Sequence, residues 1–575
     1  MLYSKLADAY DELEKTASRL AKTDVVARLL SEADAQNLPR IALLLEGRVF
    51  PAWSEKEMGI AGKTALRIVS AATGFSEDRV MKDLKETGDL GLTVEKLMAG
   101  RKQMTLGAKH IDIEKVFDSL QRLSSVEGKG SQDVKVSMVK ELVMHSSPHE
   151  AKYIIRTALG ELRVGVAEGV IRDAIGKAYF PEQYSSDGKK EVIAAIEWAW
   201  FMRPDYGEVA RMAKERGLHG LREASLKLGE PFQVLLAEKA PSLKEAIESF
   251  ENVEMEWKFD GARIQAHKDG DKVFLFTRRL ENVTAQFPDI VDMVRKHVKA
   301  KACVLEGEAL AVDQKSGKPM PFQMLSQRIH RKYDIGATAK EIPVQVNMFD
   351  IVYLDGEQLF SRTFRERRKI LESVIKADPG KFQLAVPLVT KDLDAAEKFY
   401  REALAAGQEG VMVKNLDATY QPGRRVAGGW LKVKPIMETL DLVVTGAQWG
   451  TGKRAGWMGS FMLSCRDDER GEFLECGMMG TGVKEKKAEE GDVTLTELTD
   501  MLRPLVSGEK DNMVRIRPKV VLEIAYEEIQ KSPNYGSGYA LRFPRLVKVR
   551  IDRRPEDADD ISRLQRLYAQ QKGKK

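Results

Sequence analysis

The sequence lacks several features that define whole classes of protein. Three cysteines in 575 residues, Cys303, Cys465 and Cys476, cannot supply a four-cysteine zinc site or a disulfide framework. No apolar run reaches about 18 residues, so no membrane span is predicted. The opening stretch MLYSKLADAYDELEKTASRL has no apolar region of the signal-peptide type. A reducing, cytoplasmic location is therefore the simplest expectation.

A strong charge of one sign is also lacking. The chain has 92 basic and 87 acidic side chains and a net charge of +5, too small an excess to indicate a polyanionic partner by itself. The hydrophobic fraction of 43% and the charged fraction of 31% are typical of soluble globular proteins and exclude a mainly disordered or fibrous chain. At roughly 150 residues per domain, the length predicts three or four domains.

Periodicity divides the chain into three stretches. Residues 1–229 have apolar side chains at three- and four-residue spacing and are predicted to be all-α, with a helix that starts at Ser147-Pro148. Residues 230–435 mix period-two segments with helical ones, and Asp269-Gly270 predicts a hairpin turn. Residues 436–575 contain short strands punctuated by glycine, as in a small barrel. The predicted fold class is a multidomain α+β protein.

One lysine stands in a pattern that suggests nucleophilic chemistry. Lys258, Asp260, Gly261 and Arg263 form the run Lys-x-Asp-Gly-x-Arg at the end of the alternating segment VEMEWKF. A lysine nucleophile needs a lowered pKa, which neighbouring cations or a bound metal can supply. The same pattern also fits a solvated lysine–aspartate pair at a hairpin, so it needs support from elsewhere in the chain.

Two further groups of charged residues supply that support. Alternation puts Trp430, Lys432 and Lys434 on one strand face, from which two lysines can reach a polyphosphate. Acidic residues flank glycine in predicted strands at Glu306-Gly-Glu308 and at Glu409-Gly, as an oxygen-liganded magnesium site requires. Exposed edge lysines and solvated strand-end acids remain the alternatives for each motif alone.

Taken in order, these motifs resemble those of a known superfamily. The motifs are Lys258-Phe-Asp-Gly-Ala-Arg263, Thr277-Arg278-Arg279, Glu306-Gly-Glu308, Phe349-Asp350, Glu409-Gly-Val-Met-Val-Lys414 and Trp430-Leu-Lys432-Val-Lys434. The set resembles that of the covalent nucleotidyltransferases, namely ATP-dependent DNA ligases, RNA ligases and mRNA capping enzymes. The archaeal/eukaryotic replicative type of ATP-dependent DNA ligase is most similar, because HEAKYIIRTALGELRVGVAEGVIRDAI and AYEEIQKSPNYGSGYALRFPRLVKVRID also match it.

The resemblance implies three domains and a reaction. It implies a helical DNA-binding domain (1–229), an adenylation domain (230–435) and an OB-fold (436–575). Lys258 would attack the α-phosphate of ATP to form lysyl-AMP. AMP would pass to the 5′-phosphate of nicked double-stranded DNA, and the 3′-hydroxyl would displace it, in replication, repair and recombination.

The resemblance also assigns roles to individual residues. Glu256 and Phe349 would contact adenine, and Arg278 and Glu308 the ribose. The phosphate contacts would be Arg263, Arg425, Lys432 and Lys434. Glu409, with Glu308 or Asp260, would hold Mg²⁺, with Mn²⁺ as the alternative metal. At the last motif, Arg550-Ile-Asp552-Arg553, arginine stands where the family usually has lysine, which puts the pyrophosphate-orienting role of Arg553 in doubt.

Basic side chains outside the nucleotide motifs predict contact with DNA. Lys152, Arg156, Arg163 and Arg172 are predicted to contact DNA phosphates, as is the segment LRFPRLVKVRIDRR. A sliding clamp is a weaker candidate partner, since Gln103-Met-Thr-Leu106 is followed by Lys109 and His110 rather than an aromatic pair. No membrane partner is expected. The protein is expected to be a monomer.

The main alternative is an RNA ligase with the same chemistry. A capping enzyme, an NAD-dependent ligase and an inactive DNA-binding clamp are disfavoured by the helical domain, the cysteine count and the intact Lys258.

Overall fold

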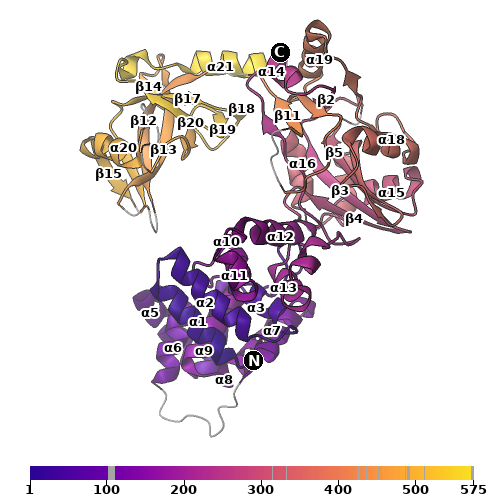
Figure 1. The fold of residues 1–575 in the computed structure, drawn as a ribbon. Helices are drawn as coiled ribbons and strands as arrows, with labels where there is room; N and C mark the ends of the chain where they lie inside the picture. The colour runs from indigo at the N-terminus through magenta and orange to yellow at the C-terminus, as the bar shows by residue number, and fades with distance from the viewer. Residues whose placement is uncertain are drawn as a thin grey trace. The chain divides into compact units, whose positions relative to one another are not determined.

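The computed structural model describes the chain except residues 101–110, 314, 332, 424–427, 436–437, 451–453, 455, 486, 488–492, 511 and 572–575. It divides into two compact units that interleave along the sequence. Figure 1 labels the helices and strands of the chain. The first unit combines Met1–Glu238, Gly261–Ala385 and Lys414–Trp430. The second combines Lys239–Asp260, Val386–Val413 and Leu431–Lys575.

The N-terminal part of the first unit is helical, as the sequence predicts. Its α-helices are α1 (Tyr3–Lys15), α2 (Arg19–Glu32), α3 (Leu38–Leu45), α4 (Gly62–Thr73), α5 (Glu77–Thr87), α6 (Leu90–Ala99), α7 (Ile113–Arg122), α8 (Ser131–Met144), α9 (Pro148–Leu159), α10 (Glu168–Tyr179), α11 (Pro181–Tyr184), α12 (Lys189–Met202) and α13 (Tyr206–Arg222). The predicted start of α9 is confirmed. Ser147 and Glu150 form a reciprocal capping box, Pro148 occupies the first turn, and Gly160 ends the helix with φ of 70°.

The rest of the first unit is built around a sheet whose order is β4-β3-β5-β6-β7, with β8 paired to β6. Its strands are β3 (Ala262–Asp269), β4 (Lys272–Thr277), β5 (Ala302–Ala311), β6 (Val344–Leu354), β7 (Glu357–Gln358) and β8 (Phe382–Leu384). Helices α15 (Pro288–His297), α16 (Phe322–Ile329), α17 (Ile335–Glu341) and α18 (Phe364–Val374) accompany it. The predicted hairpin forms, but Asp269 still pairs with Lys272, so the turn is Gly270-Asp271.

Close backbone packing explains one motif glycine in this sheet. A Cβ at Gly261 would lie 2.3 Å from the carbonyl oxygen of Ala309, so only glycine fits where β3 enters the sheet. The register then pairs Arg263 with Glu308 and Gln265 with Glu306. Residues from two motifs therefore lie on neighbouring strands.

A second, smaller sheet carries the nucleophile motif. Its order is β1-β11-β10-β2-β9, with β1 (Glu238–Lys239), β11 (Trp430–Val433), β10 (Gly410–Asn415), β2 (Val253–Lys258) and β9 (Leu388–Val389). Its apolar core includes Val253, Met255 and Val411 and is closed by α14 (Leu243–Glu248) and α19 (Leu393–Ala405). The strands predicted at VEMEWKF, GVMVK and WLKVK are all present.

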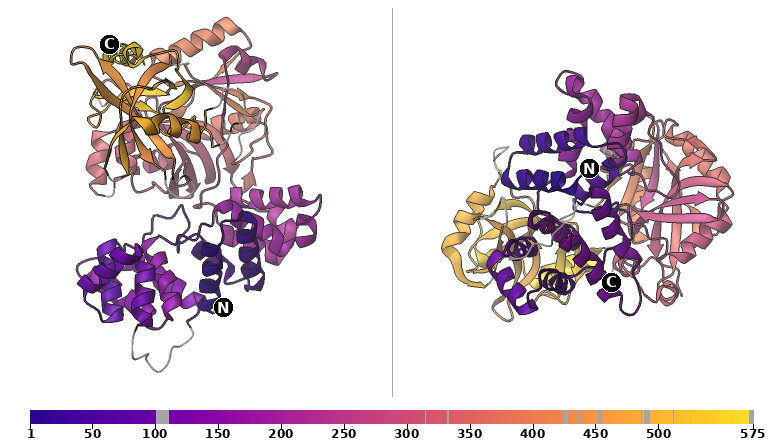
Figure 2. Two further views of the ribbon diagram at one scale, coloured as in Figure 1. Left: turned by 90° about the vertical axis from the view of Figure 1, so that its left-hand side faces the viewer. Right: turned by 90° about the horizontal axis from the view of Figure 1, so that it is seen from below.

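The C-terminal part of the second unit is rich in strands. One sheet runs β14-β13-β12-β16-β15, and β17 pairs with both β12 and β20. Its strands, which cross one another steeply in Figure 2, are β12 (Leu440–Trp449), β13 (Met458–Asp467), β14 (Glu472–Met479), β15 (Val506–Lys510), β16 (Met513–Ile516), β17 (Val521–Ala525) and β20 (Arg545–Val549). β18 (Glu528–Lys531) pairs with β19 (Tyr539–Arg542). Helices α20 (Leu495–Leu502) and α21 (Ile561–Gln570), which the periodicity did not predict, contribute Leu498 and Leu564 to the core.

Two of the opening expectations concern features of the whole chain. Cys303, Cys465 and Cys476 are buried and form no disulfide. Among the residues that the structure describes, no helix combines the length and apolar character needed to cross a membrane.

Candidate active site

A shared carboxylate organises the lysines of the second unit. Lys258 ends β2, Glu409 immediately precedes β10, and Lys434 follows β11. Oε2 of Glu409 lies 2.8 Å from Nζ of Lys258 and 2.8 Å from Nζ of Lys434. The backbone N–H of Glu409 also donates to the carbonyl of Lys258 at 2.9 Å. Of the three lysines that the motifs single out, Lys258 and Lys434 therefore meet at one acid.

Local backbone geometry brings these three residues together. Gly410 has φ of 138°, and a Cβ there would lie 2.1 Å from the carbonyl oxygen of Val433. Glycine thus lets β10 approach β11 closely enough for Glu409 to reach Lys434. Gly410 is therefore needed for the packing of β10 against β11, in addition to matching the motif.

The electrostatics of this cluster favour the ionised carboxylate. Burial opposes ionisation, but the ammonium groups of Lys258 and Lys434 outweigh it and lower the pKa of Glu409 to about 2. Burial also opposes the charged form of Lys434, yet Glu409 and Glu527 raise its pKa overall. Glu409 is therefore a fixed negative charge at neutral pH, suited to holding cations and too weakly basic to accept a proton.

The acids of β2 are buried. Alternation puts Glu254 and Glu256 on the face opposite Val253 and Met255, and their exposed fractions are 3% and 2%. The strand is covered on both sides, so its acids are interior groups rather than a solvated face. Asp260 is also buried, and its backbone N–H donates to Oε1 of Gln408 at 3.1 Å.

In the first unit, Arg263 is enclosed by protein groups. Its Nη2 lies 2.6 Å from Oε2 of Glu306, and its Nη1 donates to the carbonyl of Leu235 at 2.8 Å. The hydroxyl of Tyr420 donates to the other oxygen of Glu306 at 2.9 Å. Burial alone would lower the pKa of Arg263, but Glu306 raises it, so the arginine stays charged. Glu306, suggested above as a metal-type acid, is fully buried and neutralises Arg263 instead.

An aromatic cluster lies between two cations. Phe349 and Trp430 are buried and meet edge to face at 5.7 Å. Cζ of Arg263 lies 5.3 and 5.5 Å from their ring centroids, and Nζ of Lys414 lies 4.7 and 4.4 Å from them. Lys414 is 1% exposed and also lies 4.7 Å from the ring of Phe364. Desolvated cation–π contacts of this kind fix ring positions. The sequence analysis quoted Lys414 within a motif but gave it no role.

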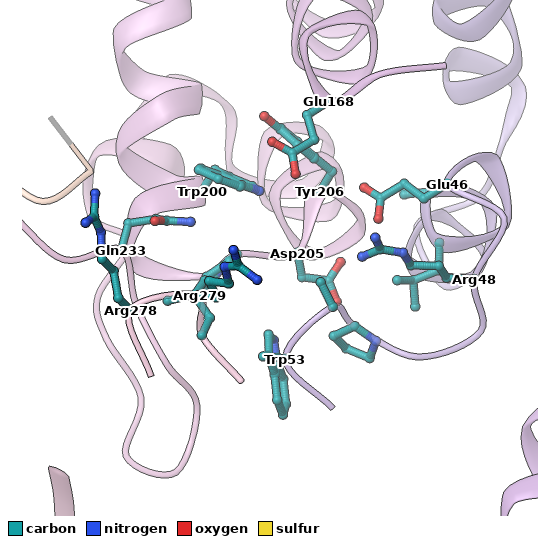
Figure 3. A pocket seen from close by; sticks show the side chains of 16 residues that line it. Glu46, Arg48, Trp53, Glu168, Trp200, Asp205, Tyr206, Gln233, Arg278 and Arg279 are labelled. Atoms are coloured by element: carbon teal, nitrogen blue, oxygen red, sulfur yellow. The ribbon is translucent and has the colours of Figure 1, made fainter. Parts of the chain in front are cut away.

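Arg278 lies in a different setting from the other predicted nucleotide contacts. With Arg279 it lines a cavity of about 260 Å³, together with Glu46, Asp205 and Trp200 of the helical region (Figure 3). Arg48 and Arg279 extend toward Asp205 from opposite sides, while Arg278 lies beside Gln233 (Figure 3). Burial raises the pKa of Glu46 to about 7. Arg278 therefore joins neither of the clusters just described.

The remaining predicted residues lie on strands or outside the described part of the chain. Glu308 on β5 and Lys432 on β11 are half-buried. Arg425 lies outside the described residues, as do Gln103–Leu106 of the clamp hypothesis. Within the described residues, no group of three or more His, Cys, Asp or Glu side chains is arranged to hold a metal ion. Of the predicted metal ligands, Glu409 has the ionised oxygen that a hard cation needs, and that oxygen contacts two lysines.

Comparison with known proteins gives consistent matches along the chain. Residues 2–176 match the family model "DNA ligase N terminus", residues 234–434 match "ATP dependent DNA ligase domain", and residues 454–553 match "ATP dependent DNA ligase C terminal region". The DNA ligase of Nanoarchaeum equitans is 46% identical over 100% of this chain and 99% of its own. That of Thermococcus onnurineus is 42% identical over 99% and 98%. The chain belongs to the ATP-dependent DNA ligase family.

Solved structures agree with the fold that this family membership implies. The structure called "Pmar-Lig_PreS3" is 17% identical, covers 95% of this chain and 99% of its own, and aligns with a TM-score of 0.52. The ligase chain therefore has an N-terminal helical domain, a central adenylation domain and a C-terminal strand-rich domain, with ATP as nucleotide substrate and DNA as polymer substrate.

Two cations of the ligase's helical domain do not lie where the sequence placed them. Lys152 and Arg156, predicted to contact DNA phosphates, are each 5% exposed. Lys152 pairs with Glu14 at 2.6 Å, and Arg156 pairs with Glu14 and, at 3.1 Å, with Asp89. The prediction was wrong for these two, because a helix amphipathic in sequence is here buried on nearly every side.

The other two cations are more accessible. Arg163 has a side chain 54% exposed and φ of 59°, in the turn between α9 and α10. Nζ of Lys22 donates to the carbonyls of Val164 and Gly165 in that turn at 2.6 and 3.2 Å. Arg172 is 27% exposed and pairs with Glu197 at 2.8 Å. Arg163 is the most exposed of the four, and its guanidinium pairs with Glu161 and, at 3.5 Å, with Asp89.

Proposed function

We propose that this ligase seals nicks in duplex DNA through lysyl-AMP and DNA-adenylate intermediates. Nζ of Lys258 attacks the α-phosphorus of ATP, the bond to the β-phosphate oxygen breaks, and pyrophosphate leaves. The AMP then passes to the 5′-phosphate of the nick, which releases Lys258. The 3′-hydroxyl attacks that phosphate, AMP leaves, and a phosphodiester bond forms. The observation that carries this proposal is the Lys258–Glu409–Lys434 cluster.

The cluster suits the first step for an electrostatic reason. Phosphoryl transfer depends mainly on positioning and on neutralising the charge that develops on the phosphate oxygens. Glu409 holds Lys258 in place without taking its proton, since a carboxyl of pKa about 2 is a very weak base. The proton that Lys258 must lose goes to solvent or to a phosphate oxygen. Lys434 then remains as a fixed cation beside the nucleophile.

The remaining roles follow the motif matches. We assign adenine to Glu256 and Phe349 and ribose to Arg278 and Glu308. We assign the phosphates to Arg263, Lys432, Lys434 and Arg425, of which Arg425 lies outside the described residues. Glu409, Asp260 and Glu308 would hold Mg²⁺, or Mn²⁺, which would supply further neutralisation of phosphate charge when bound.

Several finer statements belong to the same proposal. We propose domain boundaries at 229/230 and 435/436, an OB-fold for the strand-rich domain, and a monomer that works in replication, repair and recombination in the cytoplasm. The buried, unpaired cysteines are compatible with a reducing compartment. Clamp binding through Gln103–Leu106 stays a weak hypothesis.

The deciding experiment is an adenylylation assay. The protein is incubated with Mg²⁺ and α-labelled ATP, GTP or NAD, beside Lys258→Ala, and the label on the protein is followed. We expect label from ATP alone, absent in Lys258→Ala and discharged by nicked DNA with sealing. Discharge by nicked RNA alone would favour an RNA ligase, and label from GTP would favour capping chemistry. No label on folded protein that is not already adenylylated would refute the proposal.

A further inference from the structure

Both arginines of the C-terminal motif converge on one buried aspartate. Asp441 on β12 is 7% exposed. Its carboxylate accepts two hydrogen bonds from Nη1 of Arg550, at 3.0 and 3.2 Å. Nε of Arg553 lies 3.1 Å from Oδ2 of the same carboxylate. No motif match drew attention to Asp441.

A turn explains why the two arginines meet there. The backbone N–H of Arg553 donates to the carbonyl of Arg550 at 3.2 Å, which closes a four-residue turn and brings its first and last residues together. Asp552 folds back onto Arg550 with two hydrogen bonds of 2.9 and 2.8 Å. Arg550, with a side chain 15% exposed, therefore serves the structure of the turn.

Arg553 is held differently. Its Nε is fixed by Asp441 and its Nη1 donates to the carbonyl of Asp557 at 3.2 Å. Within the described part of the chain, its Nη2 has no hydrogen-bond partner, and 39% of the side chain is exposed. Two of the three guanidinium nitrogens are thus held by protein groups, and Nη2 remains to donate to another group.

Asp441 is itself rigidly placed. The register pairs it with Glu523 of β17, in the middle of the sheet. Its backbone N–H donates to Oδ2 of Asp559 at 2.8 Å, and its carbonyl accepts from the N–H of Asp559 at 2.8 Å. An acid fixed in this way can position a guanidinium within the tolerance that catalysis requires.

We infer that Asp441 is a positioning residue for the first chemical step, in which it aims Nη2 of Arg553 at a phosphate of the leaving pyrophosphate. The inference rests on the proposed function. It also accounts for arginine at a position where the family usually has lysine. A planar guanidinium can be held through two of its nitrogens while the third binds an anion, whereas an ammonium on a flexible stem has a single nitrogen for both tasks.

The test separates the first step from the last. Single-turnover adenylylation by ATP and Mg²⁺ measures the first step, and sealing of nicked DNA already carrying AMP on its 5′-phosphate measures the last. We expect Asp441→Asn to slow adenylylation about 10- to 100-fold, the effect of one hydrogen bond to a charged group. Sealing of the adenylylated nick should stay within about twofold of wild type. Glu438→Gln, which removes a carboxylate that is 67% exposed nearby, is the matched control and should change neither rate.

A double-mutant cycle identifies the residue through which Asp441 acts. If Asp441 acts through Arg553, Asp441→Asn should add nothing to Arg553→Gln in the first step. Three outcomes would each overturn the inference. The rate losses of the two single variants could multiply in the double variant, Asp441→Asn could slow both steps equally, or it could leave the first step unchanged. Should Asp441→Asn fail to fold, Arg553→Lys at an exposed position takes its place, with a loss of about tenfold expected and a wild-type rate refuting the inference. A wild-type enzyme that never adenylylates Lys258 would instead refute the proposed function.

Discussion

At the scale of single residues, Glu409 holds two ammonium groups, and its ionisation therefore contributes measurably to the stability of the folded chain. Its pKa of about 2 in the folded chain lies below the ordinary value of 4.5. A lowered carboxyl pKa adds stability above pH 4.5, and that stability is lost as the pH falls from 4.5 toward 2. The linkage is worth on the order of 3 kcal/mol.

We therefore expect Glu409→Gln to lose stability at neutral pH and to unfold with less dependence on pH between 4.5 and 2. Urea denaturation of both proteins at several pH values measures the difference. Parallel stability curves for the two proteins across that range would contradict the assignment. The same variant should adenylylate slowly, because Lys258 and Lys434 then repel each other at the reacting centre.

Lys414 is a second charged residue, and its ammonium group lies among aromatic rings. Its ammonium lies within 4.7 Å of three ring centroids. Lys414→Met keeps the length of the side chain but removes the charge, so we expect the free energy of unfolding to fall by about 1–3 kcal/mol. Lys414→Arg, which keeps the charge, should lose less. Equal losses in urea denaturation of the two variants would indicate that shape rather than charge matters here.

At the scale of elements, local signals predicted structure well where they were complete within a few residues. The start of α9 depends on Ser147, Pro148 and Glu150, which are adjacent, so the sequence located it. The strand character of β2 was also legible, but its burial on both faces depends on what packs against Glu254 and Glu256. The helices α20 and α21 do have apolar residues at helical spacing, namely Leu495, Leu498 and Leu502 in α20 and Leu564 and Leu567 in α21, but the interpretation of the C-terminal stretch as strands passed over them.

The candidate site shows the same limit. Motif order was sufficient to single out Lys258, Glu409 and Lys434, which the fold brings together. The pairing of Arg263 with Glu306, the position of Lys414 and the convergence on Asp441 join residues up to 112 positions apart, and the sequence offered no local sign of them. Long-range charge pairing requires the tertiary fold.

The turn between α9 and α10 carries a prediction that separates two arginines. Arg163→Ala removes an exposed cation, so binding of nicked duplex should weaken and the slope of log K against log salt should fall by about 0.9. Arg156→Met instead removes a buried cation shared by Glu14 and Asp89. Glu14 keeps Lys152 as a partner, and Asp89 keeps Arg163 at 3.5 Å. The helical domain should therefore lose about 1.5–3 kcal/mol of stability. Salt titrations of binding and thermal unfolding distinguish the two. A binding loss in folded Arg156→Met equal to that in Arg163→Ala would contradict the separation.

At the scale of the whole molecule, the proposed reaction requires one site to serve both pyrophosphate release and contact with the nick. We expect the strand-rich domain to rotate between these steps, so that one site can serve both. Within the second unit, Lys434 lies 3.4 Å from Glu527 of that domain, and a rotation would break this contact. Distances between a spin label on the adenylation domain and one on the strand-rich domain, measured with ATP and then with nicked DNA, test the motion. Identical distance distributions in both states would exclude it.

The interleaving of the two units bears on how the polypeptide is made. The chain crosses between them after Glu238, Asp260, Ala385, Val413 and Trp430. The first unit therefore lacks its last segment until the ribosome has passed residue 430, roughly 20 to 90 s after initiation at ordinary bacterial or archaeal elongation rates. The sheet containing β3 to β6 has all its strands once Leu384 is made, but the smaller sheet that carries the nucleophile waits for β11. Premature release anywhere in this window would leave unpaired strands, so truncated chains should need chaperones or degradation far more than the finished enzyme does.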